Sequence, residues 1–172
     1  SIDSHIVKTD AGLFLFYSPN TFEGDRIGTH IVVQKMSDPF TLEGEPTVVL
    51  LPSIDEEIFC RNRYKDGQHW HTLEGAFWFQ EGEWQYLMYS GGRYEDETYF
   101  VGYAAAKTTE QDLRKVKFQK MPDEQTYAPL LRSNDWEEGT GHNSVIKVDG
   151  QYYCVYHARN TEADGLSGDR RN

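Results

Sequence analysis

Residues 74–89 read EGAFWFQEGEWQYLMY, and this stretch decides the fold. It contains an aromatic run over Phe77–Phe79 and a second apolar run over Tyr86–Tyr89, separated by a turn that contains Gly82. Runs rich in aromatic residues, joined by a short Gly-containing turn, are typical of a β-hairpin. The stretch is therefore predicted to form two antiparallel strands.

The same pattern occurs at Asp3–Tyr17, with a turn at 10–12, and at His142–Tyr156, with a turn at 149–150. From Asp3 to Glu74 is 71 residues, and from Glu74 to His142 is 68. A supersecondary unit repeated at such a regular spacing indicates the blades of a β-propeller. The first strand of each blade lies beside the central axis, so Asp3, Glu74 and His142 are expected to converge there.

Two of the repeats contain further strand-like segments. Third strands are predicted at Thr29–Lys35 and Tyr99–Ala106, and fourth strands at Thr47–Leu51 and Lys115–Lys120. The repeats span about residues 2–70, 71–140 and 141–172, and the last one stops after half a blade. The chain is thus predicted to be an all-β, single partial propeller domain of about two and a half four-stranded blades.

Composition agrees with one all-β unit, since 38% of the 172 residues are hydrophobic and 14% are aromatic. A short helix is expected only at Thr108–Val116. Propellers typically need at least about four blades to remove their sheet edges. We therefore expect the chain to be a piece of a longer protein. The alternative is self-association, in which another copy supplies the remaining blades.

The formal net charge is −11, which disfavours nucleic acid and anionic membranes as partners. No apolar run approaches the ~20 residues that span a bilayer. Cys60 and Cys154 are expected to be buried free thiols, which favours a reducing, cytoplasmic compartment. The acidic segment Asp55–Glu57 is expected to be a solvated loop.

Two carboxylates at the propeller axis suit the hydrolysis of a glycosidic bond. One acid protonates the leaving oxygen and another activates water, about 6.5–9.5 Å apart in inverting enzymes. Glu74 is flanked by apolar and aromatic residues, which should raise its pKa and keep it protonated. The alternative is that Asp3 and Glu74 are ordinary residues at strand starts that bind backbone amides.

Aromatic residues near Glu74 are candidates for sugar binding. Trp70 and His71 precede its strand and Trp78 follows it, so any of them could stack on the C–H face of a sugar ring. The alternative is that Trp78 belongs to the core and Trp70 packs down from a loop. Weaker candidates lie in the loops after the first two hairpins: Phe22, Arg26, Arg93 and Tyr94.

Three segments together resemble glycoside hydrolase family 43. They are Ile2-Asp3 before a strand, Leu73-Glu74-Gly75 before an aromatic strand, and Gly141–Val145 followed by Asp149–Arg159. The resemblance covers almost the whole chain, although Ala76 stands where the family commonly has Pro. It implies a five-bladed β-propeller that acts on arabinose- and xylose-containing polysaccharides, of the arabinofuranosidase or β-xylosidase type.

The resemblance also implies roles for individual residues. Glu74 would be the general acid, and Asp3 the carboxylate that tunes the pKa of the acid and orients the sugar. His142 would lie on the axis, where the family often has calcium or a water cluster. Calcium prefers oxygen ligands, so His142 is expected to act through water; the alternative is a core histidine. Arg171, or Arg170, would bind sugar hydroxyls or Asp3.

In the family the general base comes from the blade before Asp3, so this chain alone is expected to be inactive. The sequence thus predicts an inverting glycosidase whose partner is a pentose-containing oligosaccharide. The alternative from another class is a non-catalytic, glycan-binding propeller module.

Overall fold

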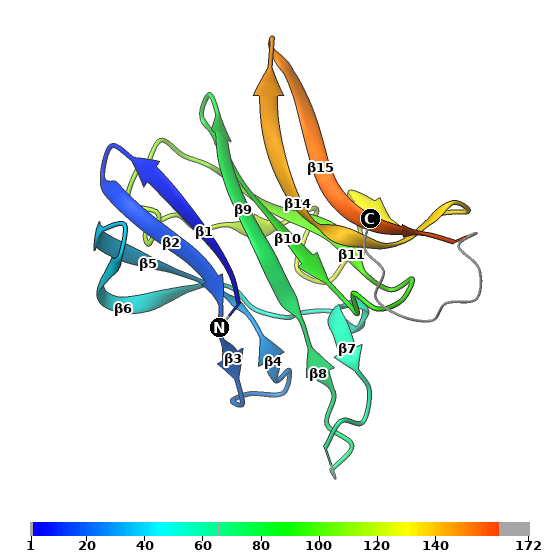
Figure 1. Ribbon diagram of the computed structural model, residues 1–172. Helices are drawn as coiled ribbons and strands as arrows, with labels where there is room; N and C mark the ends of the chain where they lie inside the picture. The colour runs from blue at the N-terminus through cyan, green and yellow to red at the C-terminus, as the bar shows by residue number, and fades with distance from the viewer. Residues whose placement is uncertain (1, 65, 162–172) are drawn as a thin grey trace.

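The computed structural model describes residues 2–64 and 66–161, which form blade-like antiparallel sheets side by side (Figure 1). The first blade has the order β1-β2-β5-β6. Its strands are β1 (Ile2–Thr9), β2 (Gly12–Ser18), β5 (Ile31–Asp38) and β6 (Thr41–Leu50). Alternate residues of β2 are buried, as the aromatic pattern predicts for a strand with one face on the core.

The second blade has the order β9-β10-β11-β12, and β13 (Leu131–Arg132) also pairs with β11. Its strands are β9 (Leu73–Glu81), β10 (Trp84–Gly91), β11 (Phe100–Lys107) and β12 (Gln119–Lys120). The four predicted strands per blade are confirmed in both blades. The fourth strand of the first blade, β6, is longer than expected, and the fourth strand of the second blade, β12, is shorter.

The third blade consists of the hairpin β14 (Glu137–Val148) and β15 (Gln151–Asn160) within the described residues. A small additional sheet lies at one end of the blades, below them in Figure 1. It has the order β3-β4-β8-β7 and is built from the connections between blade strands. Its strands are β3 (Asn20–Thr21), β4 (Gly28–Thr29), β8 (Trp70–His71) and β7 (Ile58–Cys60), and η1 (Asp55–Glu57) is a 3-10 turn just before β7.

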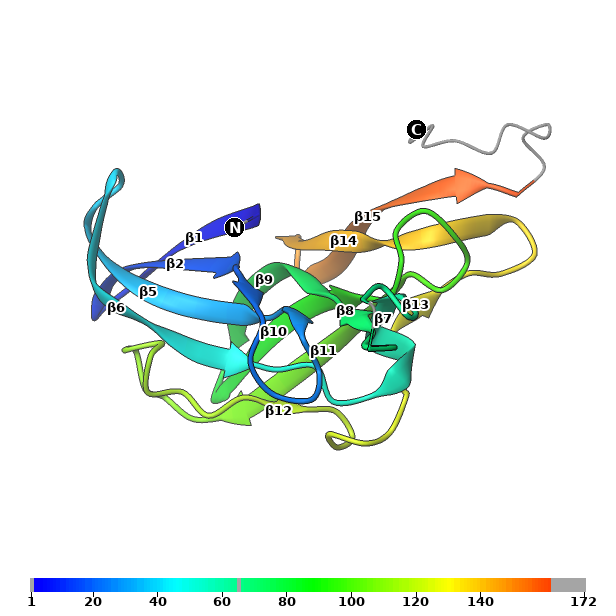
Figure 2. The ribbon, with the colours of Figure 1, turned by 90° about the horizontal axis from the view of Figure 1, so that it is seen from below.

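The first strands of the three blades are neighbours. β9 packs beside β1 on one side and beside β14 on the other, and Figure 2 shows the blades fanning out from this row. This is the radial arrangement that the repeats predict, with the starts of β1 and β9 close to the middle of β14.

The three first strands share one irregularity, which lies near the start of β1 and β9 and in the middle of β14. A β-bulge follows the same paired position in each blade, where Ile2 faces Ser18, Glu74 faces Ser90 and Gly141 faces His157. The next residue has a positive φ in each strand: 59° at Asp3, 63° at Gly75 and 49° at His142. Asp3, Gly75 and His142 are therefore the equivalent residues. The prediction that Glu74 shares their position is wrong by one residue.

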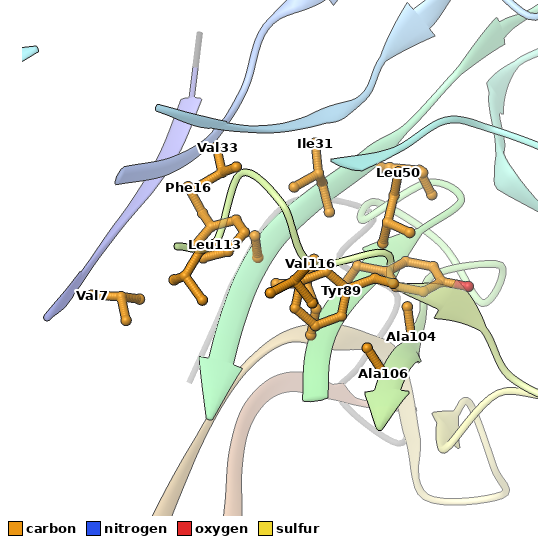
Figure 3. Packing of buried hydrophobic residues seen from close by; sticks show 14 of the residues in the cluster. Val7, Phe16, Ile31, Val33, Leu50, Tyr89, Ala104, Ala106, Leu113 and Val116 are labelled. Atoms are coloured by element: carbon orange, nitrogen blue, oxygen red, sulfur yellow. The ribbon is translucent and has the colours of Figure 1, made fainter. Parts of the chain in front are cut away.

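The hydrophobic core lies between the first two blades (Figure 3). Val7, Phe16 and Val33 come from the first blade, and Leu87 and Tyr89 from the second. The segment that follows β11 covers this core with Leu113, Val116 and Phe118.

The helix predicted at 108–116 is wrong, since this segment contains only a turn at 113–115. The fully buried amide of Gln85 donates hydrogen bonds to the carbonyl oxygens of Thr108 and Glu110, at 3.3 and 2.6 Å. A helix that began at this point would use those carbonyls for its first internal bonds. Gln85 thus competes with the helix and holds the segment against the core.

Two further expectations need correction. Cys60 and Cys154 are free thiols, as predicted, but Cys60 is half-buried and Cys154 is exposed. Cys154 is exposed because β15 belongs to a two-stranded sheet in the described part of the chain, and its neighbours Tyr153 and Val155 are exposed as well. In the acidic segment, Asp55 and Glu56 are exposed, whereas Glu57 is 0% exposed and pairs with Lys120 at 2.6 Å.

In the described part of the chain, no helix has the length and apolar character needed to cross a membrane.

Candidate active site

The starts of β1 and β9 and the bulged middle of β14 bring Asp3, Glu74 and His142 close together. The backbone N–H of Gly75, directly after Glu74, donates a 3.1 Å hydrogen bond to Oδ2 of Asp3. Nδ1 of His142 lies 3.8 Å from the same oxygen. Asp3 and His142 are 139 positions apart in sequence, and their side chains come close because the first and third blades flank the second blade at this point.

The bulges explain how these side chains reach a common point. A bulge interrupts the ladder and changes the direction of the side chains beside it. The positive φ is easy for Gly75, and Asp3 and His142 belong to the residue types that adopt it more often than other non-glycine residues. The His142 backbone is held by a hydrogen bond of 2.8 Å from its N–H to Oγ of Ser90. Non-glycine residues held at positive φ are typical of functional sites.

The carboxyl group of Glu74 has a specific partner that the sequence reasoning missed. Oη of Tyr99 donates a 2.6 Å hydrogen bond to Oε1 of Glu74. Burial raises the pKa of Tyr99 well above its usual value, and the negative charge of Glu74 raises it further. Tyr99 is therefore protonated and able to donate. Its position at the predicted start of a third strand was visible in the sequence, but nothing local linked it to Glu74.

Around Glu74 the expected apolar surroundings are present, since Leu73 and Ala76 are buried. Asp3 and His142 are more open, with side chains 19% and 43% exposed. The arrangement therefore combines three groups. The carboxyl group of Glu74 is half-buried, the carboxyl group of Asp3 accepts a hydrogen bond from Gly75, and the imidazole of His142 is open to solvent. It can supply and orient a proton for a ligand that enters from the exposed side.

Trp70 lies in the small sheet and is 7% exposed. Its ring is covered by Phe22, with the ring centroids 5.4 Å apart, and by the guanidinium of Arg63 at 4.9 Å. Little of the ring remains for a sugar, so the geometry of the described residues does not favour stacking on Trp70.

His71 is buried beside Trp70 and has two protein partners. Its Nε2 accepts a 2.9 Å hydrogen bond from Arg26, so its Nδ1 carries the proton and faces the carbonyl oxygen of Ile27 at 3.3 Å. Burial lowers the pKa of His71. The residue is thus a neutral structural histidine in the described chain, and its contact with sugar stays a prediction.

Trp78 packs against the core between the blades, and its Nε1 donates a 3.0 Å hydrogen bond to Gln85. This arrangement matches the alternative in which Trp78 is a core residue. Arg170 and Arg171, the expected partners of Asp3 or of sugar hydroxyls, lie outside the described residues.

Asp3 and His142 are the side chains that could approach an ion at the axis. Calcium usually has six to eight oxygen ligands, and residues 2–64 and 66–161 contain no group of three or more His, Cys, Asp or Glu placed to hold a metal. The described residues alone therefore do not form a calcium site, and calcium near His142 stays a prediction.

Radial blades with carboxyl groups at the ends of adjacent first strands define the chain as part of a propeller with a polar axial site. The family profile described as glycosyl hydrolases family 43 matches residues 1–172, and the chain belongs to this family.

Two relatives illustrate the range of the family. The chain is 28% identical over 148 residues to an extracellular exo-α-(1→5)-L-arabinofuranosidase of Streptomyces avermitilis, and the match covers 84% of this chain and 27% of that enzyme. It is 36% identical over 89 residues to a β-D-galactofuranosidase of Aspergillus niger, covering 51% of this chain and 23% of that enzyme. The chain thus spans about a quarter of the length of these relatives.

Solved structures agree with the fold. A thermostable family-43 glycoside hydrolase superposes with a TM-score of 0.72 at 29% identity, covering 92% of this chain and 48% of that one. An α-L-arabinanase of Cellvibrio cellulosa, solved with arabinohexaose, has a TM-score of 0.61 at 21% identity and covers 91% and 48%. The chain therefore corresponds to about half of a five-bladed family-43 propeller.

Proposed function

We propose that the protein formed with this chain is an inverting glycosidase that cleaves arabinose- or xylose-containing oligosaccharides, with Glu74 as the general acid. The observation that carries the proposal is the link between Asp3 and the residue directly after Glu74, which places two carboxyl groups at the ends of adjacent first strands. The sugar class is supported by family membership and by the arabinofuranosidase relative.

In this proposal Glu74 protonates the glycosidic oxygen as the bond to the leaving group breaks. Asp3 has two roles. Its negative charge disfavours the ionised form of Glu74, and its hydrogen bond to Gly75 fixes the backbone beside the acid. A carboxylate from another blade of the ring activates the water as general base. His142, half exposed beside Asp3, faces the sugar or ordered water.

Turnover of arabino- and xylo-oligosaccharides by the whole protein tests this assignment. Glu74→Gln should lower kcat by about 10²–10⁴-fold with little change in KM, because it removes the proton but keeps the shape. Glu83→Gln, on the exposed turn of the same hairpin, is the matched control and should leave kcat unchanged. Equal losses in kcat and in sugar affinity for Glu74→Gln would instead indicate a structural role.

Two further outcomes bear on the mechanism and on the class. NMR of the first product should show inverted anomeric configuration, and retained configuration would contradict the roles of Glu74 and of the general base. A protein that binds these oligosaccharides without cleaving them would be the glycan-binding module, the second candidate function.

A further inference from the structure

Tyr99 contacts Glu74 from the far side of a strand. Glu74 is near the start of β9 and Tyr99 directly precedes β11, so the Tyr99 side chain reaches past β10 to place its hydroxyl 2.6 Å from Oε1 of Glu74. The residue is only 1% exposed. A buried hydroxyl needs hydrogen-bond partners, and this one donates to the carboxyl group proposed to do the chemistry, with the Ser90 side chain as a second partner.

The third blade encloses the Tyr99 ring. The ring stacks on His157 of β15, with centroids 5.6 Å apart and planes 15° from parallel. A Cβ atom at position 141 would lie 2.0 Å from Cε1 of Tyr99, so only glycine leaves room for the ring beside β14. The ring of Tyr94 packs edge-on against the Tyr99 ring, with the two centroids 6.5 Å apart. Tyr99 therefore has little freedom to move away from Glu74.

We propose that Tyr99 is a positioning residue for Glu74, an inference that rests on the proposed function. A hydroxyl that donates to Oε1 makes this oxygen the poorer site for a proton, because the hydrogen bond draws electron density from it and occupies one of its two lone pairs. The proton that Glu74 delivers is then carried by Oε2. Tyr99 thus fixes both the direction of the carboxyl group and the oxygen from which the proton leaves.

The same hydrogen bond affects the protonation of Glu74. A donor stabilises the ionised carboxylate, so Tyr99 acts to lower the pKa of Glu74, whereas Asp3 acts to raise it. Among the residues that the structure describes, His142 on β14 and His157 on β15 are titratable groups that also lie near this point. Removing only the Tyr99 hydroxyl should therefore raise the pKa of Glu74.

The variant Tyr99→Phe tests the inference because it keeps the ring and its contacts. In the whole protein acting on an aryl pentoside or a pento-oligosaccharide, we expect kcat to fall about 10–100-fold with KM nearly unchanged, the effect of a misaligned acid. The alkaline limb of the pH profile, where the acid loses its proton, should move to higher pH. Tyr103→Phe is the matched control on β11, since its ring lies beside Tyr86 instead of the site.

Variants of Glu74 separate failure of this inference from failure of the proposed function. If Glu74→Gln retains activity, Glu74 is not the acid and the proposed function fails. If Glu74→Gln is inactive while Tyr99→Phe keeps the kcat and the alkaline limb of the native protein, the positioning role is wrong. A Tyr99→Phe variant that only melts at lower temperature, with an unchanged limb, would likewise reduce Tyr99 to a structural residue. Adding Tyr99→Phe to Glu74→Gln should cause no further loss of kcat.

Discussion

The N–H of Gly75 donates its hydrogen bond to the carboxylate of Asp3, and these two residues occupy the same bulge position in adjacent blades. An amide turned away from its own strand ladder by the bulge is thus satisfied by the neighbouring blade. Glu74, one residue earlier, is fixed from this side by Asp3 and from the other side by Tyr99. The position of Glu74 therefore depends on the first two blades directly and on the third blade through the ring of Tyr99, which stacks on His157.

Gly75→Ala should damage the site more than an equally strained glycine substitution elsewhere. The added Cβ would lie 3.3 Å from Cα and Cγ of His142. Gly82, in the turn of the same hairpin, also has a positive φ, 59° against 63°, but has open space around its Cβ. Both variants should lose about 1 kcal/mol of unfolding free energy to backbone strain.

The difference between the two variants isolates the contact with His142. Gly75→Ala should unfold at a lower urea concentration than Gly82→Ala and should also lose activity, whereas Gly82→Ala should stay active. Equal urea midpoints together with equal activities would contradict the close packing of β9 against β14.

Asp3→Asn should lower activity and move the alkaline limb of the pH profile to lower pH. Asparagine tolerates the positive φ at this position and can still accept the Gly75 hydrogen bond, so the fold is retained. The lost negative charge makes ionisation of Glu74 easier, and the acid then loses its proton at lower pH. The check is kcat/KM against pH, with Asp149→Asn at another positive-φ turn as the control. An alkaline limb that does not move would mean that Glu74 does not sense Asp3.

The strands and their order were predictable because their signals are local. Aromatic runs joined by Gly-containing turns determine each hairpin within a few residues of sequence, and the repeats determine which strands are equivalent. The bulges were not predictable, since a bulge is a relation between two paired strands. This is why Glu74 was placed in register with Asp3 although Gly75 is the true equivalent.

Contacts between distant segments were missed for a related reason. Tyr99 reaches Glu74 across an intervening strand, and Gln85 prevents a helix that the sequence of 108–116 would otherwise support. Glu57 looked like part of a solvated acidic run, but its partner Lys120 lies 63 residues away. The charge and the helical pattern of a segment predict the structure that the segment would adopt in isolation. In these segments, tertiary contacts override both predictions.

The buried pair of Glu57 and Lys120 gives a stability prediction. Nζ of Lys120 lies 2.6 Å from Oε1 of Glu57, and Oε2 accepts the N–H of Ser53 at 2.6 Å. Lys120→Met would leave a carboxylate buried without its counter-charge, which costs about 3–5 kcal/mol. The double variant with Glu57→Gln should recover much of this loss, because the amide is neutral and still accepts from Ser53. Urea unfolding of the three proteins checks the order, and a double variant no more stable than Lys120→Met would contradict it.

Asp112 gives a prediction for acid stability. Arg114 binds its carboxylate through two hydrogen bonds, of 2.9 and 2.8 Å, and this lowers the pKa of Asp112 from 3.8 to about 2. Because the folded-state pKa lies below the unfolded one, the stabilisation is fully present above pH 3.8 and is lost as the pH falls toward 2. The loss should be about 1–2 kcal/mol, reduced from the ideal value because the Arg114 side chain is 35% exposed.

Several other carboxyl groups also titrate in this range, so the measurement is the difference in unfolding free energy between the native protein and Asp112→Asn at each pH. That difference should be constant at neutral pH and shrink between about pH 4 and 2. The difference in unfolding free energy between the native protein and Arg114→Met should shrink over the same pH range. A difference that stays constant down to about pH 2 would show that the ion pair does not contribute to stability.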